Sequence, residues 1–400
     1  MQQQTGDPGA LGDPRALAAS GVQALRAGDP ARARDLIGQA LAIAPKDPPL
    51  WVNLALAHRA LGDTEQELAA LERALAIDPR GLYPLLLKGA AWERRGDLRK
   101  AGEAYSAALA VAPPFDQLPQ DLRPAIRRAV EVSRQQAEQR EAFLREHLAK
   151  ALGADALGGR SRFRQSVEVM LGKKSVYRQQ PHVFYFPGLP CEQFYDDRSL
   201  FPWLPEVEAA TDDIREEMLA VLKSDEGLTP YIQYPDGKPI DQWAELNHDP
   251  RWSAFHFGYE GKPNEANQAR CPRTMKALEP VDQAQIPGLS PAALYSILKP
   301  RTRIPPHTGV TNARLLCHIP LVVPENCLYR VGNDEREWRV GHGLVFDDTI
   351  EHEARNDSDK VRVMLIFDLW HPGLSQEERL QVAALFQGLC DFQKGEGFGE

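Results

Sequence analysis

Two histidines in the carboxy-terminal part of the chain have the residue type and surroundings expected of metal ligands. Five of the ten histidines fall within 65 residues, namely His307, His318, His342, His352 and His371. His307 lies in RIPPHTGVTN and His352 in FDDTIEHEARN. Neutral imidazole is the commonest ligand for redox iron, and two histidines with one carboxylate form a usual site that leaves open coordination positions. His307 and His352 are therefore candidate iron ligands, whereas we interpret His342 and His371 as structural.

An arginine within an apolar run is a second candidate group. Arg362 follows His352 by ten residues and lies in the mainly apolar run 361–370. A guanidinium stays charged and needs a carboxylate partner when it is buried. A small bound dicarboxylate could supply that partner, although Arg362 could equally reach water or pair with Asp368 on its own strand face.

Three acidic residues precede the second histidine. Asp347, Asp348 and Glu351 could ligate iron through their carboxylates. Carboxylates at such positions also form turns or orient a neighbouring ligand. We interpret them mainly in this second way.

Short strands are expected to position the candidate residues. Apolar or alternating runs predict strands at 293–299, 313–323, 327–331, 343–347 and 361–370, with helices at 205–223 and 374–393. Many short strands separated by Pro- and Gly-rich turns favour a sandwich or jelly-roll barrel. We therefore predict a jelly-roll domain with flanking helices.

The first part of the chain repeats every 34 residues. Gly-Asp pairs and prolines recur with this period, at 28–29, 62–63 and 96–97 for the pairs and at Pro45, Pro79 and Pro113 for the prolines. Each pair lies between two amphipathic runs, and each proline follows the second run, where a helix must end. The pattern predicts an all-α solenoid with repeats at about 14–47, 48–81 and 82–115, followed by a capping helix at 120–151.

A segment of small residues separates the two parts. Beyond GADALGG at 153–159, the texture changes from Ala- and Leu-rich helices to strands rich in Val, Ile, Phe and Pro. We therefore expect a multidomain protein, with the helical array at 10–152 and the strand-rich domain at 160–400.

The repeating unit resembles the tetratricopeptide repeat. Trp51, Leu54 and Ala55 in the first helix of the middle copy and Pro79 at its end carry this resemblance. It implies a groove that binds a peptide or protein partner, although a simple helical spacer stays open.

The motifs around the candidate site resemble those of aspartyl/asparaginyl β-hydroxylases. They are PHTG-TN at 306–312, R-x-x-x-H at 314–318, FDD-x-x-EHE at 346–353 and R-x-x-x-x-x-D-x-WHP at 362–372, with a fainter likeness at 201–211. The resemblance covers about half of the chain. It implies a double-stranded β-helix fold and hydroxylation that depends on Fe(II), 2-oxoglutarate and O₂.

The resemblance also implies roles for individual residues. His307 and His352 bind Fe(II), and three further residues serve 2-oxoglutarate: Ser296 and Arg362 at its distal carboxylate, and His318 at its other end.

Two positions bear directly on these implied roles. The family lacks a carboxylate ligand, and Gly309, two residues after the first histidine, agrees with this. Leu316 replaces the basic residue that the family carries two positions before His318. Arg314 lies on the same strand face and is the candidate substitute.

Composition excludes some classes of partner. The net charge is -9 without a long Lys/Arg run, which argues against nucleic acid. The sequence contains no window of 18 or more apolar residues, which is the length needed to span a bilayer. The start MQQQTGDPG lacks a secretory pattern, and the five cysteines form no CxxC pair, so we expect a cytoplasmic protein.

Several functions remain open at this level. The leading hypothesis is hydroxylation of an Asp/Asn-like or other amino-acid side chain, in a peptide recruited by the repeats. A halogenase is one alternative, because related folds with glycine at the carboxylate position, here Gly309, can bind chloride at iron. A lipid-moiety hydroxylase is another, because similar enzymes act on fatty-acyl groups. A non-catalytic scaffold is the third, because Leu316 replaces the basic residue of the family.

Overall fold

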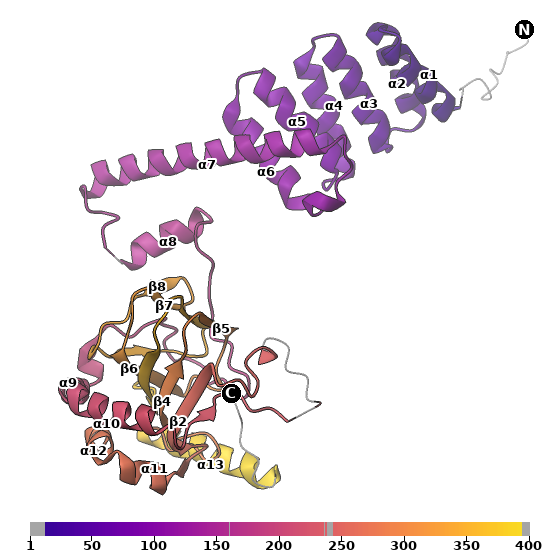
Figure 1. The fold of residues 1–400 in the computed structure, drawn as a ribbon. Coiled ribbons are helices and arrows are strands. Elements are labelled where there is room, and N and C mark those ends of the chain that lie inside the picture. The colour runs from indigo at the N-terminus through magenta and orange to yellow at the C-terminus, as the bar shows by residue number, and fades with distance from the viewer. Residues whose placement is uncertain (1–12, 160, 236, 238–242, 394–400) are drawn as a thin grey trace, which may run out of the picture. The chain divides into compact units, whose positions relative to one another are not determined.

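The chain forms two compact units. The computed structural model describes residues 13–159, 161–235, 237 and 243–393, and the contacts divide the chain between Leu171 and Gly172 (Figure 1). Helix α8 (Arg162–Met170) follows the small-residue segment 153–159 but belongs to the first unit. Residues 10–12 and 394–400 of the expected domains lie outside the described residues.

The first unit is an array of antiparallel helix pairs. Its helices are α1 (Pro14–Arg26), α2 (Pro30–Ile43), α3 (Pro48–Ala60), α4 (Thr64–Ile77), α5 (Leu82–Arg94) and α6 (Leu98–Val111). The glycine of each Gly-Asp pair has a positive φ, between 76° and 80°. The following aspartate caps the second helix of its pair, because its carboxylate accepts the N–H three residues on at 3.0–3.1 Å.

Small residues allow these helices to approach closely. Ala33, Ala57 and Ala74 are fully buried at the helix contacts. The 30-residue helix α7 (Arg123–Leu152) packs its first part on α6 through apolar residues such as Ile126 and Ala129. The array and its capping helix therefore form as the 34-residue period predicts.

The second unit contains two antiparallel sheets. The larger has the order β1-β2-β4-β11-β6-β9, with β3 beside β2, and the smaller has the order β5-β10-β7-β8. The larger sheet consists of β1 (Thr229–Pro230), β2 (Trp252–Tyr259), β3 (Lys262–Pro263), β4 (Ala293–Leu298), β6 (Arg314–Val322), β9 (Leu344–Phe346) and β11 (Arg362–Trp370). The smaller consists of β5 (Thr302–His307), β7 (Cys327–Val331), β8 (Asp334–Arg336) and β10 (His352–Asn356).

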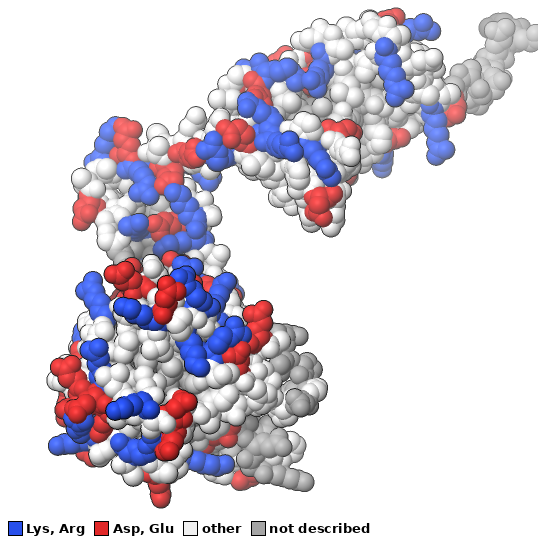
Figure 2. Space-filling model, in the orientation of Figure 1, with Lys and Arg blue, Asp and Glu red and all other residues white. Residues whose placement is uncertain are grey.

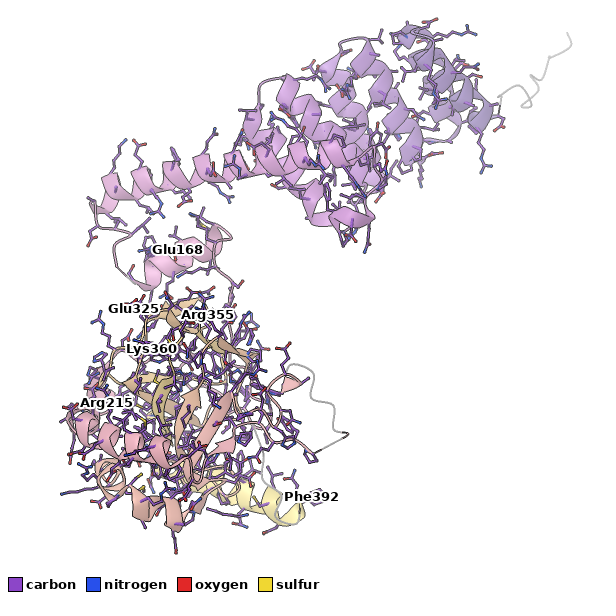
Figure 3. The ribbon with its side chains drawn as sticks, viewed as in Figure 1. Glu168, Arg215, Glu325, Arg355, Lys360 and Phe392 are labelled. Carbon is purple, nitrogen blue, oxygen red and sulfur yellow. The ribbon has the colours of Figure 1, made fainter. Side chains whose placement is uncertain are left out.

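Helices flank this pair of sheets (Figure 1). They are α9 (Leu204–Ala209), α10 (Thr211–Ser224), α11 (Glu265–Arg270), α12 (Pro272–Leu278) and α13 (Gln376–Phe392). Alternate residues of β11 serve two cores: Leu365 and Phe367 pack with Met218 of α10, whereas Met364 packs with Tyr329 of the smaller sheet. Side chains crowd the interior of the second unit (Figure 3).

The sequence predicted this architecture with two local differences. The helix expected at 205–223 is broken at Ala210, where the Thr211 hydroxyl donates a hydrogen bond to the Glu208 carbonyl oxygen at 2.6 Å. Strands β1, β2, β3, β5, β8 and β10 were not predicted. Within the described ranges, none of the helices combines the length and hydropathy needed to cross a bilayer. Acidic and basic side chains intermix on the face that Figure 2 shows.

Candidate active site

Strand pairing brings the two candidate metal ligands together. His307 ends β5 and His352 begins β10, and the two are register partners in the smaller sheet. Their ring centroids are 4.0 Å apart. Both point into a cavity of about 50 Å³ between the sheets. The cavity is lined by Tyr231, Trp252, Ser296, Ile304, His307, Thr308, Gly309, Leu316, His318, Tyr329, Phe346, Asp348, His352, Ala354, Arg362 and Ile366.

The hydrogen bonds of the two imidazoles fix their tautomers. The Nδ1–H of His307 donates to the Pro305 carbonyl oxygen at 2.7 Å, and the Nδ1–H of His352 donates to the Ile350 carbonyl oxygen at 3.0 Å. In the neutral form of each ring, Nε2 is therefore the unprotonated nitrogen, as a metal ligand requires. Burial lowers the pKa of His352 to about 4, so its ring is neutral at pH 7.

The residues fit a metal held by two imidazoles without a protein carboxylate. A Cβ atom at Gly309 would lie 2.2 Å from the Asp348 carboxylate, so no side chain can occupy that position as the site stands. Among the described residues, no cluster of three or more His, Cys, Asp or Glu could hold a metal. Water or a bound cofactor would supply the remaining ligand atoms.

The acidic residues near His352 have other contacts. Asp348 lies 3.2 Å from the Arg314 guanidinium, and Glu351 lies 2.9 Å from Arg330. Asp347 accepts hydrogen bonds from Thr349 at its Oδ1. These contacts agree with their interpretation as supporting residues.

Arg362 is a buried cation at the same cavity. It is 1% exposed, and its Nη1 lies 3.4 Å from the Ser296 hydroxyl. Its guanidinium lies over the Trp338 ring at 4.8 Å, and its Nε has no hydrogen-bond partner. Although burial lowers the pKa of Arg362 to about 10, the group is charged at pH 7. A buried cation with unused donors fits an anionic ligand.

His318 lies on the inner face of β6 and also lines the cavity. It is 5% exposed and packs against Tyr329 and Phe346, with centroid separations of 5.0 and 4.7 Å. Burial lowers the pKa of His318 well below its usual value, so the ring is neutral. Its Nδ1 has no hydrogen-bond partner.

Arg314 is placed differently from the other candidates. Its guanidinium contacts Asp348 at 3.2 Å and Asp368 at 3.9 Å, and all three side chains are almost completely buried. Arg314 lines a neighbouring cleft of about 580 Å³ rather than the small cavity, whereas Leu316 lines the cavity itself. The structure thus brings five of the six candidate residues to one cavity and places Arg314 beside it.

Aromatic residues that the sequence interpretation missed enclose the site. Trp252 donates its Nε1–H to the Ser296 hydroxyl at 3.1 Å and stacks on Tyr231 with centroids 3.9 Å apart. Trp243 packs edge-on against His307 at 5.0 Å. Only their residue type could have indicated these aromatic residues in the sequence. They lie in or beside segments without a clear hydrophobic period. Tyr231 lines both the cavity and the cleft.

Comparison with known families decides the identity of the two units. The model of the aspartyl/asparaginyl beta-hydroxylase family matches residues 208–372, and a tetratricopeptide-repeat model matches residues 24–83. The second unit is a domain of the aspartyl/asparaginyl β-hydroxylase family. The first unit carries tetratricopeptide repeats. Members of this hydroxylase family typically depend on Fe(II) and 2-oxoglutarate.

Several relatives share the hydroxylase domain. The aspartyl/asparaginyl beta-hydroxylase of Mus musculus is 36% identical over 186 residues, which are 46% of this chain and 25% of that protein. The ornithine lipid ester-linked acyl 2-hydroxylase of Rhizobium tropici is 36% identical over 180 residues, 44% of this chain and 60% of that protein. The chain thus spans between a quarter and about three fifths of the length of these relatives.

The tetratricopeptide repeats also have counterparts among solved structures. The Sgt2 tetratricopeptide-repeat domain from Aspergillus fumigatus is 26% identical, covering 34% of this chain and 88% of that chain, with a TM-score of 0.29.

Proposed function

We propose that this protein is an Fe(II)- and 2-oxoglutarate-dependent hydroxylase that acts on an aspartyl/asparaginyl or other amino-acid side chain. One observation supports this most strongly. The cavity combines two opposed imidazoles, His307 and His352, with a buried guanidinium, Arg362, that has no carboxylate partner within 4.0 Å among the described residues. The family of the domain points in the same direction.

The cavity residues divide the binding tasks. The Nε2 atoms of His307 and His352 would hold the metal, and Arg362 with the Ser296 hydroxyl would hold the distal carboxylate of 2-oxoglutarate. Bound Fe(II), with 2-oxoglutarate and O₂, supplies the oxidation that converts an acceptor C–H bond to C–OH. His318, neutral and on the inner face of β6, would contact the cosubstrate without adding charge.

The surrounding residues control access to the cavity. Tyr231, Trp243 and Trp252 cover one side with aromatic surface, which keeps water from the ligands and stiffens the wall. The 580 Å³ cleft, which shares the lining residue Tyr231 with the cavity, would be the path by which an acceptor reaches the metal. Its lining includes Tyr234, Tyr259 and Leu294, together with polar side chains.

A lipid acyl group is the second candidate acceptor. The Rhizobium tropici relative named as an acyl hydroxylase is as similar in identity as the mouse relative, at 36%. The aromatic and aliphatic part of the cleft lining suits an acyl chain as well as the side chains around an acceptor residue. The tetratricopeptide array instead supports a peptide or protein acceptor, since such arrays present an extended binding surface.

Release of CO₂ from 1-labelled 2-oxoglutarate separates these acceptors. Fe(II)-loaded protein is incubated with panels of Asp- and Asn-containing peptides or with acyl lipids. Stimulation by peptides, with a mass increase of one oxygen on the stimulating peptide, supports the leading proposal. Stimulation by lipids alone supports the second. Absence of CO₂ release and of succinate under every condition would contradict both.

A further inference from the structure

A segment that precedes the family match lies against the loop that follows His307 and the loop that precedes His352. We call residues 175–186 the strap. The strap backbone donates from Gln180 N to the Thr349 carbonyl oxygen at 2.7 Å and from His182 N to the Gly309 carbonyl oxygen at 3.0 Å. Val183 N continues the contact with the Val310 carbonyl oxygen at 3.1 Å. The strap therefore contacts the loop after His307 and the loop before His352.

One strap side chain connects the two loops. The Gln179 amide donates from Nε2 to Asp347 Oδ2 at 2.6 Å and accepts at Oε1 from Asn312 Nδ2 at 3.1 Å. Asp347 and Asn312 are completely buried. Nε2 of Gln179 also donates to the Pro190 carbonyl oxygen at 3.1 Å. Asp347 precedes His352 by five residues, and Asn312 follows His307 by five residues. A single amide thus links a buried group near each imidazole.

Asp347 is tied into its own loop, whereas Asn312 is tied to the end of the strap. Asp347 Oδ1 accepts the N–H and the hydroxyl of Thr349 at 2.9 and 2.6 Å. Asn312 accepts Phe186 N at its Oδ1 at 2.7 Å and donates to the Phe186 carbonyl oxygen at 2.9 Å. Because these bonds fix both side chains, Gln179 is a side-chain link that joins Asp347 to Asn312 and the strap.

We propose that Gln179 is a positioning residue that clamps the loop after His307 to the loop before His352 and so steadies the two imidazoles that strand pairing brings together. Only its effect on metal affinity rests on the proposed function. Removing the amide leaves one Asp347 oxygen without its donor and frees the Asn312 amide hydrogen. Groups that orient metal ligands typically change metal affinity by about 10- to 100-fold when they are removed.

The adjacent residue provides a matched control. Gln180 has the same side chain, but that side chain is exposed, and its backbone N–H bond to Thr349 survives replacement by alanine. In the full chain, Gln179→Ala should raise the dissociation constant for Co(II) by about 10-fold or more and change the Co(II) absorption spectrum. Gln180→Ala should leave both unchanged. The free energy of global unfolding is measured for each variant as well. A general loss of stability would lower this free energy but would not by itself change the Co(II) spectrum of the folded protein.

Hydrogen exchange of the metal-free protein tests the clamp independently of the metal. The Gly309 amide donates to the Asp348 carbonyl oxygen at 2.7 Å across the two loops, and the Thr349 amide donates to Asp347. Both amides should exchange faster in Gln179→Ala and not in Gln180→Ala. Unchanged exchange at both would overturn the proposal, whatever the metal data show. A wild type that binds no metal at His307 and His352 would contradict the proposed function instead, and exchange would still decide the clamp.

A charge swap provides a rescue. Gln179→Glu keeps the side-chain size but places a carboxylate against Asp347, so it should loosen both loops. This variant gives a second test that does not depend on whether the alanine variant folds. When Asp347→Asn is added, the new amide at position 347 can donate to the new carboxylate at position 179, which reverses the direction of the original bond. Asn312 can still donate to that carboxylate. The double variant should recover slow exchange and most of the Co(II) affinity. Double-variant exchange as fast as in Gln179→Glu alone would contradict a direct bond between the two positions.

Discussion

Replacing Arg362 by lysine separates the charge of this residue from its geometry. The guanidinium is held by the Trp338 ring at 4.8 Å and the Ser296 hydroxyl at 3.4 Å, and its Nε has no partner. If 2-oxoglutarate binds here, its distal carboxylate can accept two parallel hydrogen bonds from the planar group. The ammonium of lysine keeps the charge and loses this paired geometry.

The expected loss follows from the bonds removed. One charge-assisted hydrogen bond is worth about 1.5–3 kcal/mol, so Arg362→Lys should raise the dissociation constant of 2-oxoglutarate roughly 10- to 150-fold. Arg362→Ala removes the charge as well, and loss of one partner of a buried charged pair costs about 2–5 kcal/mol, or roughly 30-fold and more. Fe(II) affinity should change little, because Arg362 is not a metal ligand.

The pH dependence of the lysine variant gives a second signature. Burial already lowers the pKa of Arg362 from 12.5 to about 10. The same burial acts on a lysine whose ordinary pKa is only about 10.4, which brings its titration toward neutral pH. Only the protonated amine binds the carboxylate. Affinity in Arg362→Lys should therefore fall as the pH rises through this pKa, whereas wild-type affinity should stay flat between about pH 6.5 and 8.

The assay is an anaerobic titration of Fe(II)-loaded protein that follows the metal-to-ligand charge-transfer band of 2-oxoglutarate. Arg355→Lys is the matched control, because Arg355 is an exposed arginine in β10, labelled in Figure 3, whose contact is with Asp357. Equal affinity in the wild type, Arg362→Lys and Arg362→Ala would refute the placement of the cosubstrate. Arg314 would then be the first residue to test.

Three further outcomes are expected. Replacing His307 or His352 by alanine should raise the Fe(II) dissociation constant roughly tenfold or more by equilibrium dialysis, and undiminished iron in the double variant would exclude the pair as ligands. Gly309→Asp should lower the free energy of unfolding by about 1–3 kcal/mol, because its Cβ would overlap the Asp348 carboxylate. An unchanged free energy of unfolding with tighter iron binding would show that the loop can rearrange to admit a carboxylate ligand. A fragment beginning at Gly172 should fold and bind 2-oxoglutarate, and a folded fragment without binding would show that the repeats contribute to the site.

The sequence predicted those parts of the fold that have a local signal. The 34-residue period works because each Gly-Asp pair encodes both a positive φ and a helix cap. Strands β6 and β11 carry long apolar runs and were predicted closely. Strands β5 and β10 were missed because β5 contains two prolines and β10, with the sequence HEARN, has no apolar alternation. Their pairing is specified by contacts across the fold.

The same distinction applies to the site. His307, His352 and Arg362 were recognisable from residue type and motif, but their meeting at one cavity depends on a strand register that no local pattern encodes. Arg314 shares a strand face with His318, yet the buried carboxylates of Asp348 and Asp368 hold it beside the cavity. Residue parity gives the face of a strand, and it cannot give the partner of a long side chain.

The most direct test of the proposed site is to locate the metal and the cosubstrate together. Crystals of the protein grown anaerobically with Mn(II), as a redox-inert substitute for Fe(II), and 2-oxoglutarate would be measured for anomalous scattering. The predicted result is one strong peak between the Nε2 atoms of His307 and His352, with the distal carboxylate of 2-oxoglutarate against Arg362. A metal held elsewhere in the domain, or 2-oxoglutarate bound away from Arg362, would contradict the assignment.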